Sequence, residues 1–316
     1  MSGRCRVCEV AGFDARFDLR ENMFGTGEIF AYDRCENCGC VQISEFPENI
    51  ADYYPDNYYS YSKHNASNLH RAKEVGRIAL ALHGPGWLFA RQSWWLRGDF
   101  RSLRDTRARP SERILDIGCG RGDLIRTLAD IGFRRLLGVD PFIESEISHS
   151  NGVRILRCDP SALQGEFDLI MLHHSFEHAW DQRRMASDVF RLLAPGGRCI
   201  VRIPTVDSWA WQEFGVEWVQ ADAPRHFYLH TRRSIAGLLE TSGLLVTRIV
   251  DDSSGFQILG SEKIRRGLPL VDPKTGELDF AATLPAEMIG SSEARARALN
   301  SVGRGDAIAV HARRSS

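Results

Sequence analysis

The chain has 316 residues, of which 43% are hydrophobic, 26% charged and 9% aromatic. These values are typical of a globular protein and exclude a disordered, collagen-like or membrane-embedded chain. Forty Lys and Arg residues against 41 Asp and Glu residues leave a net charge of −1, without the basic excess typical of nucleic-acid-binding proteins. No apolar run is long enough for a membrane span. The first residues lack the apolar segment of a secretory signal, so we expect a cytoplasmic protein.

Two Cys-x-x-Cys pairs stand in the first 40 residues, and a glycine follows the second pair. The four cysteines are Cys5, Cys8, Cys35 and Cys38. Each pair brings two thiolates onto one tight turn, and together they supply the four sulfur ligands that structural Zn²⁺ takes. We therefore predict a closed zinc site that stabilises a small N-terminal module, residues 1–62. Reduced thiols without metal are the alternative, and Cys40 is expected to be buried behind the site.

A tyrosine-rich segment and a basic helical connector are expected to follow this module. Five tyrosines stand between residues 53 and 61, where they favour either the wall of a substrate mouth or packing between domains. Residues 63–109 carry ten Lys or Arg residues with interleaved aromatic side chains. Their spacing predicts two amphipathic helices interrupted at Gly84-Pro85-Gly86. We favour a helical cover over the next domain. Binding of RNA, an anionic membrane surface or a phosphate-bearing small substrate is the alternative.

A strand, a glycine turn and a helix are predicted from residue 113 onward. Residues 113–117 form a buried strand that contains Asp116, and residues 124–131 continue at helical spacing. The glycines of the turn are Gly118, Gly120 and Gly122. They let the backbone turn tightly and approach a ligand closely. Such a loop is shared by several nucleotide-binding proteins. However, a carboxylate before the first glycine disfavours a pyrophosphate and favours a ligand with a cationic amine.

Strands and helices alternate through the rest of the chain. The strand at 135–140 ends in Asp140, which is placed to accept both hydroxyls of a ribose. Further strands are expected at 153–159, 167–172, 198–203, 244–250 and 306–312, and helices at about 181–193 and 231–242. This alternation predicts a parallel, doubly wound α/β sheet that binds ligands at the carboxyl ends of its strands. Residues 255–305 are expected to be an insertion before the last strand.

Three stretches of the sequence resemble the class I S-adenosylmethionine-dependent methyltransferases. They are Leu115-Asp116-Ile117-Gly118-Cys119-Gly120-Arg121-Gly122, the later Asp140, and Leu192-Leu193-Ala194-Pro195-Gly196-Gly197-Arg198. The resemblance is strongest over residues 110–252 and implies a Rossmann-like, seven-stranded methyltransferase sheet within residues 110–316. By this likeness, the glycine loop and Asp116 hold the methionine part of the cofactor, Asp140 the ribose diol and Asp159 the adenine amine. The implied cofactor-binding residues are Asp116, Gly118, Cys119, Gly120, Gly122, Asp140, Pro141, Asp159 and His173.

The cysteine pairs and residues 224–230 resemble the sugar C-methyltransferases that act on nucleotide-linked deoxysugars and carry a zinc-binding domain. The likeness implies His226 as the general base, with Tyr228 and His178 positioning the substrate. For each histidine, a structural hydrogen-bonded imidazole is the alternative. The run His173-His174-Ser175-Phe176-Glu177-His178 raises a metal site as a further alternative. We disfavour that site because the run holds neither a His-x-x-His pair nor a His-Glu-x-x-His helix.

The methyl acceptor is less defined by the sequence than the cofactor. The loop after the fourth strand lacks the Asn/Asp-Pro-Pro-aromatic pattern of the enzymes that methylate nucleic-acid bases. Aromatic side chains follow the fifth strand and suit either a ring substrate or a packed lid: Trp209, Trp211, Phe214 and Trp218. We expect a small-molecule acceptor, most simply a hydroxyl or carbon of a sugar, nucleotide-sugar or glycan, or an aromatic hydroxyl. An RNA or protein methyltransferase that uses the zinc module and the basic connector, and a cofactor-binding protein without turnover, are the alternatives.

Overall fold

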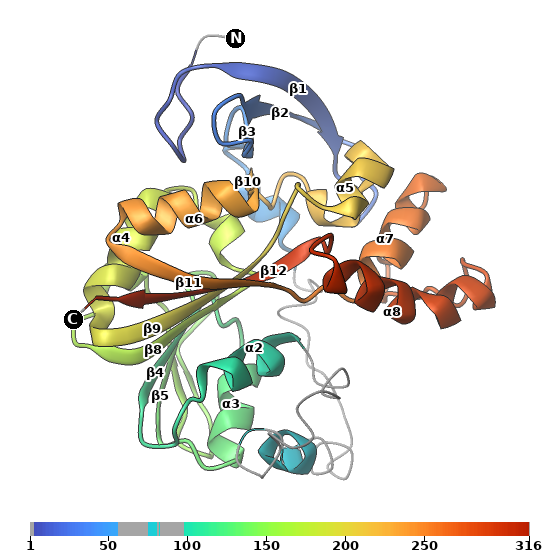
Figure 1. The fold of residues 1–316 in the computed structure, drawn as a ribbon. Coiled ribbons are helices and arrows are strands. Elements are labelled where there is room, and N and C mark those ends of the chain that lie inside the picture. Colours follow the sequence, from blue (N-terminus) through green and yellow to red (C-terminus); the bar gives the residue numbers. More distant parts are fainter. Residues whose placement is uncertain (1–2, 56–74, 81, 83–97, 316) are drawn as a thin grey trace.

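The computed structural model describes residues 3–55, 75–80, 82 and 98–315 (Figure 1). The expected break of the connector helices at Gly84-Pro85-Gly86 lies outside these residues, as do Tyr58, Tyr59 and Tyr61. Within the connector, residues 75–80 are helical, and helix α2 (Gly98–Thr106) lies at its end. Phe100 and Leu103 of α2 are buried in one cluster with apolar residues of the large sheet. This part of the connector therefore covers the sheet.

The N-terminal sheet is completed by a strand from far along the chain. Its own strands are β1 (Phe13–Arg20), β2 (Ile29–Cys35) and β3 (Val41–Ile43), which pair antiparallel in chain order. The fourth strand, β10 (Tyr228–Leu229), pairs antiparallel with β3. It belongs to the segment 224–230 that the resemblance marked as substrate-binding. The cysteine-rich module is therefore joined by a backbone ladder to residues that follow the fifth predicted strand.

The large sheet has the mostly parallel, Rossmann-like architecture that the sequence predicted. Its strands, in spatial order, are β11 (Leu244–Asp251), β12 (Ala307–Arg314), β9 (Leu193–Pro204), β8 (Phe167–His173), β4 (Arg113–Ile117), β5 (Arg135–Val139), β7 (Arg154–Leu156) and β6 (Ile147–Ser148). The sheet has eight strands where seven were expected, because the two-residue β6 pairs antiparallel at the edge. The apolar run of β8 is buried on both faces, as parallel strands in the middle of such sheets are.

The last strand also differs from the expected parallel arrangement, because β12 runs antiparallel to both of its neighbours. The insertion leaves β11 at its carboxyl end and returns to the same end, where Asp252 N donates to Ala307 O. A parallel strand would need a crossover to the opposite end of the sheet. The insertion instead forms two helices outside the sheet, α7 (Phe256–Arg265) and α8 (Ala286–Ser301).

Helices cover both faces of the large sheet (Figure 1). The covering helices are α2, α3 (Asp123–Asp130), α4 (Gln182–Leu192) and α6 (Arg232–Thr241). The short α5 (Trp209–Phe214) lies beside α7, and the chain also has the one-turn 3₁₀ helices η1 (Ile50–Tyr53), η3 (Pro160–Ala162), η4 (Phe176–His178), η5 (Gly215–Glu217) and η6 (Val219–Ala221). In Figure 1, α4 and α6 lie on the side of the N-terminal sheet, and α2 and α3 lie on the other. Helix α6 begins after Thr231, whose hydroxyl accepts a bond from Ser234 N in a capping box. Among the described helices, none is long and apolar enough to cross a membrane.

Candidate active site and candidate metal centre

A cavity of about 530 Å³ opens at the carboxyl ends of the central parallel strands, the position at which such sheets bind ligands. One half is lined by the glycine loop after β4 and by the ends of β5 and β7, and the other by the segment after β8. The predicted cofactor residues that border it are Asp116, Gly118, Cys119, Gly120, Asp140, Pro141, Asp159 and His173. Gly122 stands one step away, before the first residue of α3. The cofactor roles of these residues stay predictions.

The glycine loop packs so closely that side chains are excluded from it. Gly118 has φ +71°, and a Cβ on it would stand 2.3 Å from the Cβ of Ser175. Gly122 has φ +79°, and a Cβ there would stand 2.4 Å from the end of Ile155. Both glycines are therefore required by backbone conformation and by space. The loop lies open toward the cavity as a cradle of backbone, which fits the nucleoside and methionine parts of S-adenosylmethionine.

Asp140 ties the glycine loop to the end of β5. Its Oδ2 accepts a bond of 2.9 Å from Gly120 N, and its Oδ1 accepts one of 2.9 Å from Phe142 N. Burial raises the pKa of this carboxyl, and the two N–H donors act against that shift. Each carboxylate oxygen has a further lone pair for a ligand hydroxyl. Asp159 is more exposed and caps η3 by accepting from Ser161 N.

Asp116 is the most deeply buried acid of the cavity, with 3% of its surface exposed. Burial raises its pKa well above the usual carboxyl value, and the charges of Asp99 and Asp140 raise it further. A cationic group that enters the cavity would favour the ionised form of Asp116. The arrangement therefore fits the amine of a methionine-like ligand, as the charge pattern of the sequence predicted.

This pKa shift gives the affinity for such a ligand a pH dependence with a definite sign. Because its pKa is raised, Asp116 is more easily kept neutral in the folded protein than in the unfolded chain. The folding stability that the neutral carboxyl contributes is lost as the pH rises through the raised pKa. A cationic ligand needs the carboxylate, so we expect the affinity for S-adenosylmethionine to increase as pH rises above the usual range of a carboxyl group. Isothermal titration calorimetry at a series of pH values above that range measures the effect. Asp116→Asn should bind more weakly and show a flatter profile; an equally steep profile in that variant would assign the dependence to another group.

The mouth of the cavity contains aromatic and basic side chains, most of which the sequence did not single out. The Tyr54 ring stacks on Phe142, with centroids 6.1 Å apart and planes 8° apart. Trp180 also borders the cavity and leaves 70% of its surface exposed. Arg184 and Arg202 complete this part of the wall. The sequence analysis had pointed only to Tyr54, as part of the tyrosine-rich segment. For that segment, a substrate mouth and packing between domains were about equally favoured.

The aromatic residues after the fifth strand do not border this cavity. Trp218 is buried and its Nε1 donates to Asp306 Oδ2 at 2.9 Å. The Trp211 ring packs edge-on against Trp218 and also against Phe17 of the N-terminal sheet. These contacts correspond to the packing alternative of the sequence analysis and not to a ring-binding surface.

The three residues predicted to act on the substrate lie at different depths. His178 borders the cavity; its Nδ1 donates to Arg225 O at 2.9 Å, and burial lowers its pKa to about 4. His226 stands directly behind it, 4% exposed, with the two ring centroids 4.7 Å apart. Tyr228 lies further back in β10, where its hydroxyl donates to Trp180 O. Of the three, His178 alone is part of the cavity wall, and the roles of all three stay predictions.

Glu177 is a buried acid that the sequence analysis treated only as part of the histidine run. Its side chain is fully buried, and among the described residues its carboxylate accepts no hydrogen bond. His174 Nδ1 lies 3.4 Å from Oε1, and His226 Nε2 lies 3.9 Å from the same atom. Burial would raise the pKa of Glu177, but the contacts with His174 and His226 outweigh it and lower the pKa to about 2.

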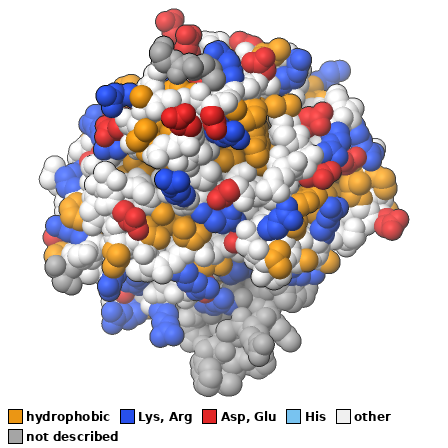
Figure 2. All heavy atoms as spheres, turned by 45° about the horizontal axis from the view of Figure 1, so that its top comes forward, with side chains coloured by type: hydrophobic (Ala, Val, Ile, Leu, Met, Phe, Trp, Pro, Cys, Tyr) orange, Lys and Arg blue, Asp and Glu red, His pale blue; other side chains and the backbone are white. Residues whose placement is uncertain are grey.

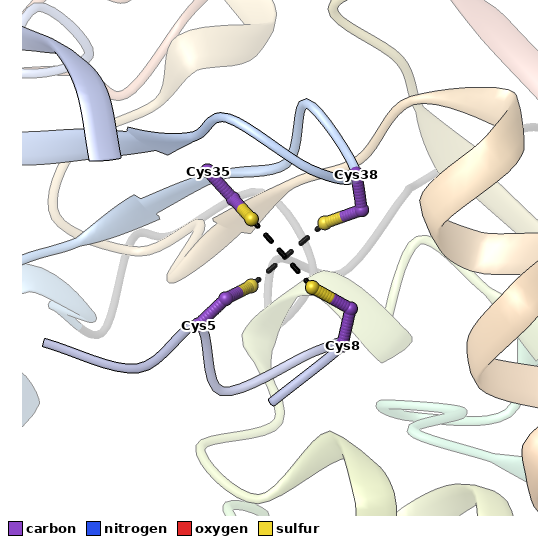
Figure 3. Close-up of side chains that lie close together, drawn as sticks. All are labelled: Cys5, Cys8, Cys35 and Cys38. Carbon is purple, nitrogen blue, oxygen red and sulfur yellow. Dashed lines mark hydrogen bonds between the residues drawn. The ribbon is translucent and has the colours of Figure 1, made fainter. Parts of the chain in front are cut away.

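The four cysteines of the two pairs point at one another (Figure 3). Cys5 Sγ lies 3.8 Å from Cys38 Sγ, and Cys8 Sγ lies 3.6 Å from Cys35 Sγ. Four thiolates about 2.3 Å from a tetrahedral zinc ion stand about 3.8 Å apart, so the arrangement fits the predicted metal. Cys40 is fully buried and lies outside the group, as expected. The cluster could hold zinc, and its occupancy stays a prediction.

Comparisons with known proteins agree with the site at the level of the family. Residues 95–249 match a family described as a methyltransferase domain. A probable S-adenosylmethionine-dependent methyltransferase of Mycolicibacterium smegmatis is 28% identical over 148 residues, which is 42% of this chain and 52% of that protein. A ubiquinone biosynthesis O-methyltransferase of a Caulobacter species is 32% identical over 120 residues, or 34% and 47% of the two chains.

The matched region is a part of each protein, because the chain spans about half the length of the curated relatives it matches. A solved S-adenosylmethionine-dependent methyltransferase from Mesorhizobium loti is 18% identical, with a TM-score of 0.47 over 70% of this chain and 100% of that one. The family match coincides with α2, the glycine loop and the sheet through β11. Residues 95–249 therefore form a methyltransferase domain of the class I S-adenosylmethionine-dependent family.

Proposed function

We propose that the protein transfers a methyl group from S-adenosylmethionine to a small molecule, such as a saccharide or an aromatic compound with an acceptor hydroxyl or carbon. The observation that carries the proposal is the shape of the single cavity described above. It joins the glycine loop and Asp140 to a wall of histidine and aromatic side chains, so that a cofactor and a second ligand share one enclosed space. When bound, the cofactor supplies a methyl group activated on a sulfonium.

The chain's own residues would bind, orient and desolvate the reactants. Asp116 would hold the cationic amine and Asp140 the ribose hydroxyls, which fixes one reactant in the direction of the histidine wall. Tyr54 and Trp180 offer flat apolar faces to a ring at the mouth. His178, with His226 behind it, stands at the acceptor end and is the group that we expect to activate the acceptor atom.

A small acceptor is supported by the size of the cavity and by the mixed charge of one face of the molecule. On the face drawn in Figure 2, Lys and Arg side chains alternate with Asp and Glu side chains across the described residues. Such mixed charge does not favour a polyanion, which is bound by an extended basic surface. The Caulobacter relative is named as an O-methyltransferase, which supports an oxygen acceptor.

The proposal is tested with purified protein and a cofactor that carries a deuterated methyl group. We expect mass spectrometry of an extract from the source organism, incubated with both, to find the label in a small-molecule fraction. His178→Ala should keep affinity for the cofactor and transfer at least tenfold less label, since general acid–base groups contribute about 10²–10⁴-fold. Label that enters only the RNA or protein fraction would overturn the small-molecule acceptor, and no label beyond the protein-free control would overturn transfer.

A further inference from the structure

Glu177, His178 and His226 form a cluster behind the acceptor end of the cavity. One ligating atom from each lies within 4.8 Å of the others. His178 and Glu177 belong to η4, whereas His226 comes from the segment before β10, 48 residues later in the chain. The sequence argued against a metal here because residues 173–178 lack the spacing of a local motif. The fold supplies the missing ligand from a distant segment.

The two imidazoles are oriented as metal ligands are. Nδ1 of His178 lies 2.9 Å from Arg225 O, and Nδ1 of His226 lies 2.8 Å from Gln220 O. A carbonyl oxygen can only accept, so both Nδ1 atoms carry a proton, and in the neutral form of each ring Nε2 has the lone pair. Metal-binding histidines are commonly held in this way, with the outer ring nitrogen donating to a carbonyl or carboxylate.

Two carboxylates face the Nε2 atom of His226. Glu177 Oε1 lies 3.9 Å away and Asp222 Oδ2 lies 3.7 Å away. Both distances are too long for hydrogen bonds. Two ligands about 2.1 Å from one tetrahedral ion stand about 3.4 Å apart, so a small contraction would bring the Glu177 and His226 atoms into coordination.

Carboxylates outnumber arginines around the cluster. Three buried carboxylates, those of Glu21, Glu177 and Asp222, meet one guanidinium, that of Arg225, which contacts Glu21 at 2.8 Å and Asp222 at 2.7 Å. The imidazoles of His174 and His226 are the remaining groups that can offset the carboxylates, at 3.4 Å and 3.9 Å from Glu177. Arg202 acts on Glu177 at longer range, but Asp252 already binds its guanidinium at 2.7 Å. The two carboxylate oxygens of Glu177 accept no hydrogen bond from the described residues, and a buried carboxylate without hydrogen bonds is costly.

We propose that Glu177, His178 and His226 form a second metal site that takes a divalent transition metal ion such as Zn²⁺. Two nitrogen ligands and one oxygen ligand are a donor set that such ions accept, with a fourth position left open. The ion reaches the site from the cavity, which His178 borders. It would give the acceptor end of the proposed methyltransferase a Lewis acid, and the two histidines would then act on the acceptor through the ion and not as free bases.

Cobalt titration of the metal-free full chain tests this site separately from the cysteine site and without any methyl donor or acceptor. We expect the wild-type protein to bind two equivalents of Co²⁺, one with the strong near-ultraviolet absorption of cobalt–thiolate bonds and one without it. Glu177→Gln and His226→Asn should each bind one equivalent and keep the thiolate absorption. His149→Asn, which changes an exposed histidine outside the cluster, should still bind two.

The same cobalt titration can also contradict the proposed second metal site. A single equivalent in the wild-type protein, or two equivalents in both variants, would overturn it and return His178 and His226 to the role of free bases. Two chemically different variants are used so that a folding defect in one, detected by its circular dichroism and unfolding temperature, leaves the other decisive. Because no reaction is measured, failure of the methyltransferase proposal would not change this result.

Discussion

Replacing Asp140 by alanine is expected to weaken the binding of S-adenosylmethionine at least tenfold. A hydrogen bond to a charged group contributes about 1.5–3 kcal/mol, and about 1.4 kcal/mol corresponds to a factor of ten in affinity. The substitution also removes the acceptor for Gly120 N and Phe142 N, so the cradle itself should loosen. Isothermal titration calorimetry with the full chain gives the two dissociation constants.

The matched control is Glu166→Ala, which removes an exposed carboxylate just before β8, at the opposite end of the strands. This variant should bind the cofactor as the wild-type protein does. If Asp140→Ala also bound it with unchanged affinity, the ribose role of Asp140 would be wrong. The nucleoside would then have to lie elsewhere in the cavity.

The double substitution Cys35→Ser/Cys38→Ser is expected to remove one zinc equivalent per chain and to unfold the N-terminal sheet. A small module has a thin core, and structural zinc supplies about 10–16 kcal/mol in isolated zinc-finger peptides. The consequence should extend beyond the module, because Tyr32 of β2 donates its hydroxyl to His226 O at 2.8 Å. We therefore expect faster amide hydrogen exchange across residues 226–229 together with the loss of zinc.

Elemental analysis by mass spectrometry and hydrogen exchange read out the two effects separately. Cys158→Ser is the control, because Cys158 is a partly buried thiol outside the cluster. That variant should keep its zinc and its slow exchange. Full zinc content in the double variant would show that the metal is held by other groups, and unchanged exchange would show that β10 does not depend on the module.

Features that arise from neighbouring residues could be predicted from the sequence. The apolar run of β8, the Thr231 cap of α6 and the glycine loop after β4 each depend on a short stretch of chain, and each lies where expected. The cysteine pairs are local in the same sense, since the two cysteines of each pair are three residues apart on one turn. Only the meeting of the two turns is a long-range event.

Features that depend on contacts between distant segments could not be predicted from the sequence. The sequence near Val41 does not indicate that β3 will pair with β10. The sequence near Glu177 does not indicate that His226 will lie beside it. The reversed direction of β12 follows from the path of an insertion whose helices lie outside the sheet. In each case the structure depends on how two distant surfaces fit together. The periodicity and spacing of residues along one segment do not contain that information.

The pairing of β3 with β10 also sets an order of events during synthesis. Residues 41–43 cannot form this pairing until residues 228–229 have left the ribosome. At a synthesis rate of roughly 5–20 residues per second, the delay is about 10–40 s. Throughout this interval the outer strand of the nascent N-terminal sheet has an unsatisfied edge, which is a template for unwanted pairing. Early capture of a metal ion by the four cysteines would keep that edge short and ordered until its proper partner arrives.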